Sequence, residues 1–131
     1  MIAIDTSAFI AILLDEPERL SFNQCITDNQ PALTSAVSLQ EAGMIMRSRK
    51  GDIGVQDLFT LLTTLRVQVS AYDEAQARVA IDAFGRYGKG MGTAAKLNMG
   101  DCASYALAKS LNVPLLYKGN DFPATDIAAA I

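Results

Sequence analysis

The stretch that decides the fold class spans residues 99–122 and reads MGDCASYALAKSLNVPLLYKGNDF. Its apolar middle predicts a helix over Cys102–Leu111, and the short apolar run that follows predicts a strand over Val113–Tyr117. Asp101 opens this helix–strand unit, and Asp121 follows it by a few residues. Aspartates in these places are either ordinary capping and turn residues or two corners of one acidic site.

The same alternation of short apolar strands with helices extends through the rest of the chain. Further strands are expected over Met1–Ile4, Ala32–Ser35 and Arg66–Ala71. The other expected elements are a last short segment over 125–131 and helices over residues 7–14, 17–27, 38–50 (ended by Gly51), 55–65 and 73–87. This pattern predicts one α/β domain over residues 1–131 with a mainly parallel sheet. Sites in such sheets form at the carboxyl ends of the strands.

The composition narrows the possible chemistry. Half of the 131 residues are hydrophobic and 19% are charged, which excludes a disordered chain. The chain has no histidine, which excludes Ser-His-Asp and Cys-His catalysis and histidine-ligated zinc. Cys25 and Cys102 are far apart in the sequence and are expected to be reduced, buried thiols. A net charge of −3 argues against a general nucleic-acid coating protein but allows a local basic patch beside a metal ion.

The opening segment MIAIDTSAFIAILL is apolar but does not read as an export signal. It contains Asp5 and lacks a basic start and a cleavage site. It is also too short to span a bilayer. We therefore expect a cytoplasmic protein that has no membrane partner.

Three carboxylates are expected at one edge of the sheet. Asp5 directly follows the first strand, Glu41 lies in the first turn of the helix after the second strand, and Asp121 follows the last strand. Strand ends and the starts of the helices that follow them share one edge, so we expect these three to face one crevice. Simple alternation places Asp101 on a helix that runs toward the opposite edge, unless the loop over 88–100 returns it to the site.

Each of these acids also has a local interpretation. Ser38 and Glu41 form an S-x-x-E capping box, and Ser7 fits as the cap of the first helix. Asp121 lies in a turn sequence, and Asp126 could cap the last segment.

As a set, carboxylates within about 4–6 Å of one another would repel each other, which would raise some of their pKa values. A divalent cation removes that cost. Three or four acids without histidine suit Mg²⁺ or Mn²⁺, which can activate a water and neutralise a phosphate.

Four segments carry a family resemblance. They are MIAIDTSA at residues 1–8, S-x-x-E at 38–41, LNMGDCASYALAK at 97–109 and LLYKGNDF at 115–122. On these segments the chain resembles the PIN-domain ribonucleases, specifically the VapC-type toxins of type II toxin–antitoxin pairs, over nearly its whole length. The resemblance implies a three-layer α/β/α sandwich with a central mainly parallel sheet. It also implies endonucleolytic cleavage of RNA that depends on Mg²⁺ or Mn²⁺.

The resemblance also implies the site residues. The acidic quartet of the family, which is both catalytic and metal-binding, falls on Asp5, Glu41, Asp101 and Asp121. In this fold Asp101 reaches the acidic pocket. Cleavage then proceeds by attack of a metal-activated water, without a side-chain nucleophile.

Further residues are assigned supporting roles by the same resemblance. Ser7 or Thr6 matches a small hydroxyl residue that supports the site by hydrogen bonding, and Asp126 is a secondary candidate for the site. Two departures from the family pattern concern Thr93–Lys96, where relatives often carry a histidine, and Met99, where an aromatic residue is common. Neither departure touches the quartet, but both could reshape the substrate loop.

The expected partners are RNA, an antitoxin and a second copy of the chain. The basic residues that either contact RNA phosphates or belong to an ordinary solvated surface are Arg47, Arg49, Lys50, Arg86, Lys89 and Lys96. Relatives form homodimers, with possible larger hetero-oligomers, and a cognate VapB-type antitoxin lays an apolar helix in a groove. The residues that could line this groove, or belong to the core, are Phe9, Ile10, Leu13 and Leu14.

Three other functions compete with a nuclease. A haloacid-dehalogenase-type phosphatase needs D-x-D-x-T after the first strand, and here the second aspartate position is Ser7. A non-enzymatic receiver module needs a lysine after the last strand, which Lys118 supplies, but it also needs an acidic pair where Asp5 stands alone. An inactive PIN-like scaffold is the third alternative, and the intact acidic quartet argues against it.

Overall fold

Four parallel strands form the centre of the molecule. The computed structural model describes all residues, Met1–Ile131, and orders the strands β3-β2-β1-β4. Parallel pairing aligns Ile2 with Ala32 and Ala3 with Leu115. The elements in chain order are β1 (Ile2–Ile4), α1 (Thr6–Leu13), α2 (Arg19–Asp28), β2 (Ala32–Ser35), α3 (Ala36–Thr64), β3 (Val67–Ser70), α4 (Glu74–Tyr87), α5 (Met99–Leu111) and β4 (Leu115–Leu116).

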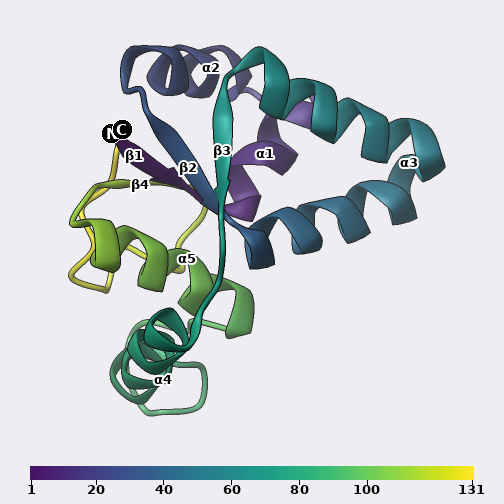
Figure 1. The fold of residues 1–131 in the computed structure, drawn as a ribbon. Coiled ribbons are helices and arrows are strands. Elements are labelled where there is room, and N and C mark those ends of the chain that lie inside the picture. The colour runs from purple at the N-terminus through teal and green to yellow at the C-terminus, as the bar shows by residue number, and fades with distance from the viewer.

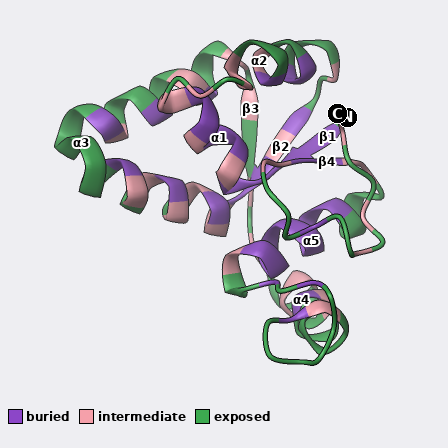
Figure 2. Ribbon diagram, turned by 180° about the vertical axis from the view of Figure 1, so that it is seen from behind, coloured by how far each residue is buried: buried purple, intermediate pink, exposed green.

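Helices cover both faces of this sheet (Figure 1). Because successive residues of a strand point to opposite faces, β1 contributes to two cores. Ile2 and Ile4 belong to the core beneath α1, α2 and α3, whereas Ala3 belongs to the core beneath α4 and α5. Figure 2 shows buried residues along β1, β2 and β4 and the facing sides of α1 and α5, with exposed residues on the outer helices and on the edge strand β3. The predicted three-layer α/β/α sandwich is confirmed.

The helix α3 carries a kink at Gly51. This residue has φ 63° and ψ −146°, a left-handed conformation that favours glycine. The two helices predicted on either side of Gly51 therefore form two arms of α3. Ala42 from the first arm and Leu58 from the second are both buried in the same core.

Two helices begin earlier than the sequence predicts. Asp5, not Ser7, caps α1, and its side chain accepts a hydrogen bond from the Ser7 backbone N–H. Ser35 caps α3 through the N–H of Val37, so the predicted S-x-x-E capping box is wrong. The first turn of α3 is already closed by Ser35, which places Glu41 in the second turn with its carboxylate available for other contacts.

In the C-terminal part of the chain, the predicted helix and strand occur in the predicted order, but their bounds differ. The helix α5 begins at Met99 because Asn98 caps it, with Asp101 completing a capping box. The strand β4 is only two residues long, and in place of the expected last element there is a single bridge between Leu115 and Ala129.

The direction of β4 determines where α5 begins. Because β4 is parallel to β1, the helix before it must start at the edge where β1 ends. The end of α4 already lies beside the start of α5, because the segment between them closes on itself through hydrogen bonds of 3.0 Å from Lys89 N–H to the Leu97 carbonyl and from Leu97 N–H to the Tyr87 carbonyl. The expectation that simple alternation would send Asp101 to the opposite edge is therefore wrong.

Two further expectations were tested. Cys25 and Cys102 are buried and free, as predicted. None of the helices combines the length and the apolar character that a membrane crossing requires.

Candidate active site

A pocket of about 420 Å³ lies where β1 and β4 end and α1, α3 and α5 begin. It brings together all four acids of the predicted quartet. A fifth acid, Glu16, also lines it, together with a single basic residue, Lys118. The remaining lining residues are Thr6, Ser7, Ile10, Ile45 and Gly119.

Asp5 is the most firmly held of these acids. It follows β1 directly, and only 4% of its surface is exposed. Its Oδ2 accepts hydrogen bonds from the Ser7 backbone N–H at 3.0 Å and from the Ser7 hydroxyl at 2.6 Å. Its Oδ1 accepts one from the Ser104 hydroxyl at 2.5 Å. With three donors on its two oxygens, this carboxylate has a fixed orientation.

Behind Asp5 lies a chain of buried hydroxyls. Because the Ser104 hydroxyl donates to Asp5, the Ser38 hydroxyl, 3.0 Å away, must donate to Ser104 Oγ. The Thr6 hydroxyl in turn donates to the Ser38 carbonyl at 3.2 Å. The predicted support from Ser7 is thus direct, whereas Thr6 acts through the backbone of α3. The chain ties α1, α3 and α5 together beneath the pocket.

Asp101 lies in the first turn of α5, where its carboxylate also serves the cap. Its Oδ2 accepts from the Asn98 backbone N–H at 3.0 Å. Burial, followed by the negative charges of Asp5, Asp121 and Glu41, raises the pKa of Asp101 to about 7. This effect means that the four carboxylates act on one another electrostatically.

Glu41 and Asp121 are the more accessible members of the group. Glu41 is half-buried on α3, and its carboxylate lies against the backbone of Gly100 at the start of α5. A Cβ atom at position 100 would lie 2.7 Å from Glu41 Oε1, so only glycine permits this close approach. Asp121 is exposed on the loop after β4. These two side chains therefore stand at the mouth of the pocket, with the two aspartates deeper inside.

The donors of this pocket suit a hard divalent cation. Carboxylates and hydroxyls are the ligands that Mg²⁺ and Mn²⁺ prefer, and they require no histidine. As placed, the side chains do not form a ready-made site of three carboxylates around one point. The fit therefore depends on the shared pocket, the all-oxygen donor set and the like charge that raises the pKa of Asp101. A cation among these acids would offset their mutual repulsion.

The structure does not bring Asp126, the secondary candidate, to this pocket. Its carboxylate instead pairs with Lys109 Nζ at 2.8 Å and accepts a hydrogen bond from the Tyr105 hydroxyl at 2.6 Å. Arg86, a predicted RNA contact, lies 3.7 Å from the same carboxylate and stacks over the Tyr87 ring. The charge of Arg86 is therefore already matched by an acid away from the pocket.

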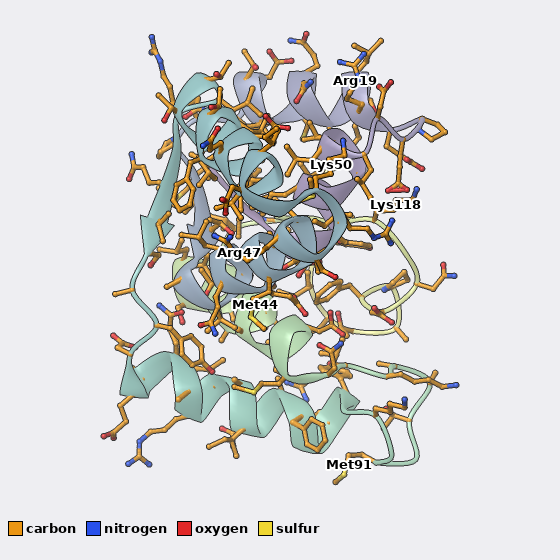
Figure 3. The ribbon with its side chains drawn as sticks, turned by 90° about the vertical axis from the view of Figure 1, so that its right-hand side faces the viewer. Arg19, Met44, Arg47, Lys50, Met91 and Lys118 are labelled. Atoms are coloured by element: carbon orange, nitrogen blue, oxygen red, sulfur yellow. The ribbon has the colours of Figure 1, made fainter.

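The other predicted RNA contacts are exposed but do not line the pocket. Arg47, Arg49 and Lys50 lie on the first arm of α3, and Arg47 pairs with Asp52 at 2.5 Å. Figure 3 shows Arg47 and Lys50 on this arm. Lys89 and Lys96 lie on the segment between α4 and α5. Contact with a bound strand would require RNA to extend beyond the acidic pocket.

The sequence reasoning missed the contacts that several residues make around the acids. Ser104 lies three residues after Asp101, and Ser38 lies three residues before Glu41, so each serine shares a helix face with an acid. That spacing could have revealed both. Glu16 and Lys118 meet only in three dimensions, with Nζ 2.9 Å from Oε2. The proposed groove residue Phe9 is fully buried in the core.

Known proteins resemble this chain in both sequence and fold. The sequence matches the PIN domain family over residues 2–128. A protein of Mycolicibacterium smegmatis named Ribonuclease VapC is 44% identical over 126 residues, which cover 96% of this chain and 97% of that protein. The fold is similar to that of VapC20 of Mycobacterium tuberculosis, described as a toxin that cleaves the sarcin–ricin loop, with a TM-score of 0.79, 17% identity and coverage of 98% and 97%. FitAcB from Neisseria gonorrhoeae gives a TM-score of 0.68 at 20% identity, with coverage of 98% and 96%.

Proposed function

The chain belongs to the PIN-domain family, among the VapC ribonucleases, and on this premise we propose that it is the endoribonuclease toxin of a VapBC-type toxin–antitoxin pair. One observation carries the proposal: four carboxylates line a single pocket at the carboxyl end of the sheet in a chain without histidine. Hydrolysis by an acidic, metal-loaded site is the phosphodiester chemistry that such a set supports. The whole chain, residues 1–131, would act as one PIN domain.

In this proposal Asp5, Glu41, Asp101 and Asp121 hold Mg²⁺ or Mn²⁺. A bound ion of this kind supplies a water of lowered pKa and neutralises charge on the phosphate during an in-line displacement. Asp5 contributes a carboxylate whose orientation is fixed by Ser7 and Ser104. Asp101 contributes a carboxylate whose ionised form near neutral pH would be favoured by positive charge, because burial and its acidic neighbours raise its pKa to about 7.

Glu41 and Asp121 act at the mouth of the pocket in this scheme. Their greater exposure lets them adjust to an incoming strand or reach a ligand through water. None of the serines is required as a nucleophile, because a metal-activated water serves that purpose in this scheme. Ser7 and Ser104 both donate their hydroxyl hydrogens to Asp5. Their role is to hold the acid in place.

The proposal is tested by cleavage of bulk RNA with Mg²⁺ and with EDTA. We expect cleavage with Mg²⁺, loss of cleavage with EDTA, and a decrease of at least about 100-fold for Asp5→Asn. Asp57→Asn, an exposed change on α3, is the matched control and should retain full activity. Equal rates with Mg²⁺ and with EDTA would exclude the metal-dependent mechanism, and a fully active Asp5→Asn would remove Asp5 from the site.

The proposed partners are RNA, a VapB-type antitoxin and a second copy of the chain. Large apolar side chains are exposed along α3, α4 and the start of α5, including Met44 at 64%, Ile81 at 70% and Met99 at 79%. Such exposure supports a protein interface rather than a solvated monomer surface. Light scattering of the purified chain, alone and with the protein from the neighbouring reading frame, measures both associations. Cytoplasmic location stays a prediction.

A further inference from the structure

Lys118 is the one basic side chain that lines the acidic pocket. It lies two residues after β4, on the segment that leads to Asp121. Five acids share the pocket with it, so an unassisted phosphate would meet a strongly negative surface. A positive charge at this place can attract the phosphate of the substrate, which the acids cannot do.

The fold fixes the position of Lys118 through its backbone. Its N–H donates to Ser7 Oγ at 2.9 Å, and the same hydroxyl donates to Asp5 Oδ2 at 2.6 Å. Lys118 is therefore only two hydrogen bonds away from the most buried acid of the pocket. A shift of the Lys118 backbone would therefore also move the Ser7 hydroxyl that holds the Asp5 carboxylate.

The side chain of Lys118 is held by two glutamates from the connection between α1 and α2. Nζ lies 2.9 Å from Glu16 Oε2 and 3.1 Å from Glu18 Oε2. Figure 3 shows Lys118 beside this connection, on the side of the molecule away from Met91. Hydrogen bonds to Glu16 and Glu18 raise the pKa of Lys118, so the ammonium stays charged.

The group formed by the Lys118 ammonium and the carboxylates of Glu16 and Glu18 has a net negative charge. An ordinary surface ion pair, with one carboxylate to one ammonium, has none. A phosphodiester oxygen carries the same charge and the same hydrogen-bond acceptor character as a carboxylate oxygen. It can therefore replace Glu16 or Glu18 on the ammonium without leaving Nζ unpaired. Because the side chain of Lys118 is about one third exposed, at 35%, a strand in the pocket can reach it.

We propose that Lys118 binds a phosphate of the RNA strand at the acidic pocket, in exchange for the carboxylates of Glu16 and Glu18. The inference rests on the proposed ribonuclease function and names a substrate-binding residue for it. Glu16 and Glu18 hold the ammonium at the rim before RNA enters. They also compete with the phosphate, so they weaken RNA binding as they order the lysine.

The exchange makes opposite predictions for the two sides of the ion pair. Lys118→Gln should weaken the binding of RNA about 10-fold and reduce the dependence of log affinity on log salt by about one unit. Lys118→Arg should retain most of the affinity. The double change Glu16→Gln and Glu18→Gln should tighten binding, because the phosphate no longer displaces charged competitors. Lys109→Gln, which removes a lysine from the ion pair with Asp126, is the matched control and should leave binding unchanged.

Binding is measured by fluorescence anisotropy of a labelled single-stranded RNA, in an Asp101→Asn background and with Mg²⁺, so that the measurement does not depend on cleavage. Melting temperatures verify that each variant is folded. Wild-type affinity and salt dependence for Lys118→Gln would overturn the inference, as would weaker binding by the double glutamine variant. Failure of the proposed function shows separately, as absence of RNA cleavage by the wild-type chain with Mg²⁺.

Discussion

The Ser104 hydroxyl donates a hydrogen bond of 2.5 Å to Asp5 Oδ1 and joins two residues that are 99 positions apart in the sequence. Both residues are almost fully buried, Ser104 at 1% and Asp5 at 4% exposure. Because Ser104 lies on α5 and Asp5 follows β1, this contact fixes the helix that carries Asp101 to the strand that carries Asp5. The mutual position of the two deepest acids depends on it.

We predict that Ser104→Ala lowers both the stability of the fold and RNA cleavage. Loss of a hydrogen bond to a buried charged group costs about 1.5–3 kcal/mol in the free energy of unfolding. The turnover rate should decrease about 10-fold, since Asp5 keeps only its Ser7 donors and can rotate. Urea unfolding and initial rates of RNA cleavage measure the two effects.

The matched control for Ser104→Ala is Ser110→Ala, an exposed serine on the same helix, α5. It should change the free energy of unfolding by less than about 0.5 kcal/mol and leave cleavage unchanged. Full activity of Ser104→Ala, with its stability lowered as expected, would show that the Ser104–Asp5 hydrogen bond serves the fold alone.

A second prediction separates activity from stability at Gly100. A Cβ atom there would lie 2.7 Å from Glu41 Oε1 and 2.9 Å from Oε2, which are the flexible end of a half-buried side chain. Gly100→Ala should therefore displace the carboxylate at little cost to the fold, and alanine even favours the helix, by about 0.5–1 kcal/mol. We expect a raised melting temperature together with RNA cleavage reduced about 10-fold.

Gly85 offers the control for this experiment, because a Cβ atom at that position of α4 meets no atom within 4 Å. Gly85→Ala should stabilise the protein by up to about 1 kcal/mol and leave cleavage unchanged. If Gly100→Ala cleaves RNA as fast as Gly85→Ala does, the carboxylate of Glu41 has no role at the place where the structure puts it.

The order of the elements and the place of Asp5 were predictable because both depend on local sequence. An apolar run sets each strand, helical spacing sets each helix, and an aspartate directly after the first strand must lie at the edge of a parallel sheet. A helix end at Gly51 was predicted for the same reason, and the structure instead continues α3 past this glycine with a kink.

The position of Asp101 was not predictable from alternation, because α4 ends beside the start of α5 and not at the opposite edge of the sheet. Backbone hydrogen bonds between Lys89, Leu97 and Tyr87 hold these two helix ends together, and no side-chain pattern encodes them. The pairing of Lys118 with Glu16 joins residues 102 positions apart, so it could not be predicted from local sequence either. The Ser104–Asp5 contact has a local signature only in the spacing of Ser104 from Asp101.

Asp101 gives a prediction for the pH dependence of the metal-free protein. Its pKa is raised to about 7 in the folded state, by burial first and then by Asp5, Asp121 and Glu41, and is about 4 when the chain is unfolded. The unfolded carboxyl thus loses its proton over a pH range in which the folded one keeps it. The contribution of Asp101 to the free energy of unfolding is therefore highest below about pH 4 and decreases as the pH rises to about 7, by up to about 1.4 kcal/mol per unit.

Urea unfolding in EDTA between pH 5 and pH 8 measures this dependence. Asp101→Asn removes the titrating group and should flatten the slope, whereas Asp57→Asn, on an exposed face of α3, should keep it. Added Mg²⁺ should stabilise the wild-type chain most at pH 8, where the carboxylates are ionised. The same slope in Asp101→Asn and in the wild type would assign the pH dependence to another group.

The last prediction concerns Asp126, which the structure places in an ion pair rather than in the acidic pocket. Its pKa is lowered to about 2, first by Lys109 and then by the Tyr105 hydroxyl, so its contribution to stability is present above about pH 4 and is lost as the pH falls to about 2. Asp126→Ala leaves the buried Tyr105 hydroxyl without an acceptor and should cost about 1–3 kcal/mol in unfolding free energy at pH 7. Asp126→Asn keeps an acceptor and should cost less. Both variants should cleave RNA at the wild-type rate when folded. A folded variant without activity would show that Asp126 does take part in catalysis.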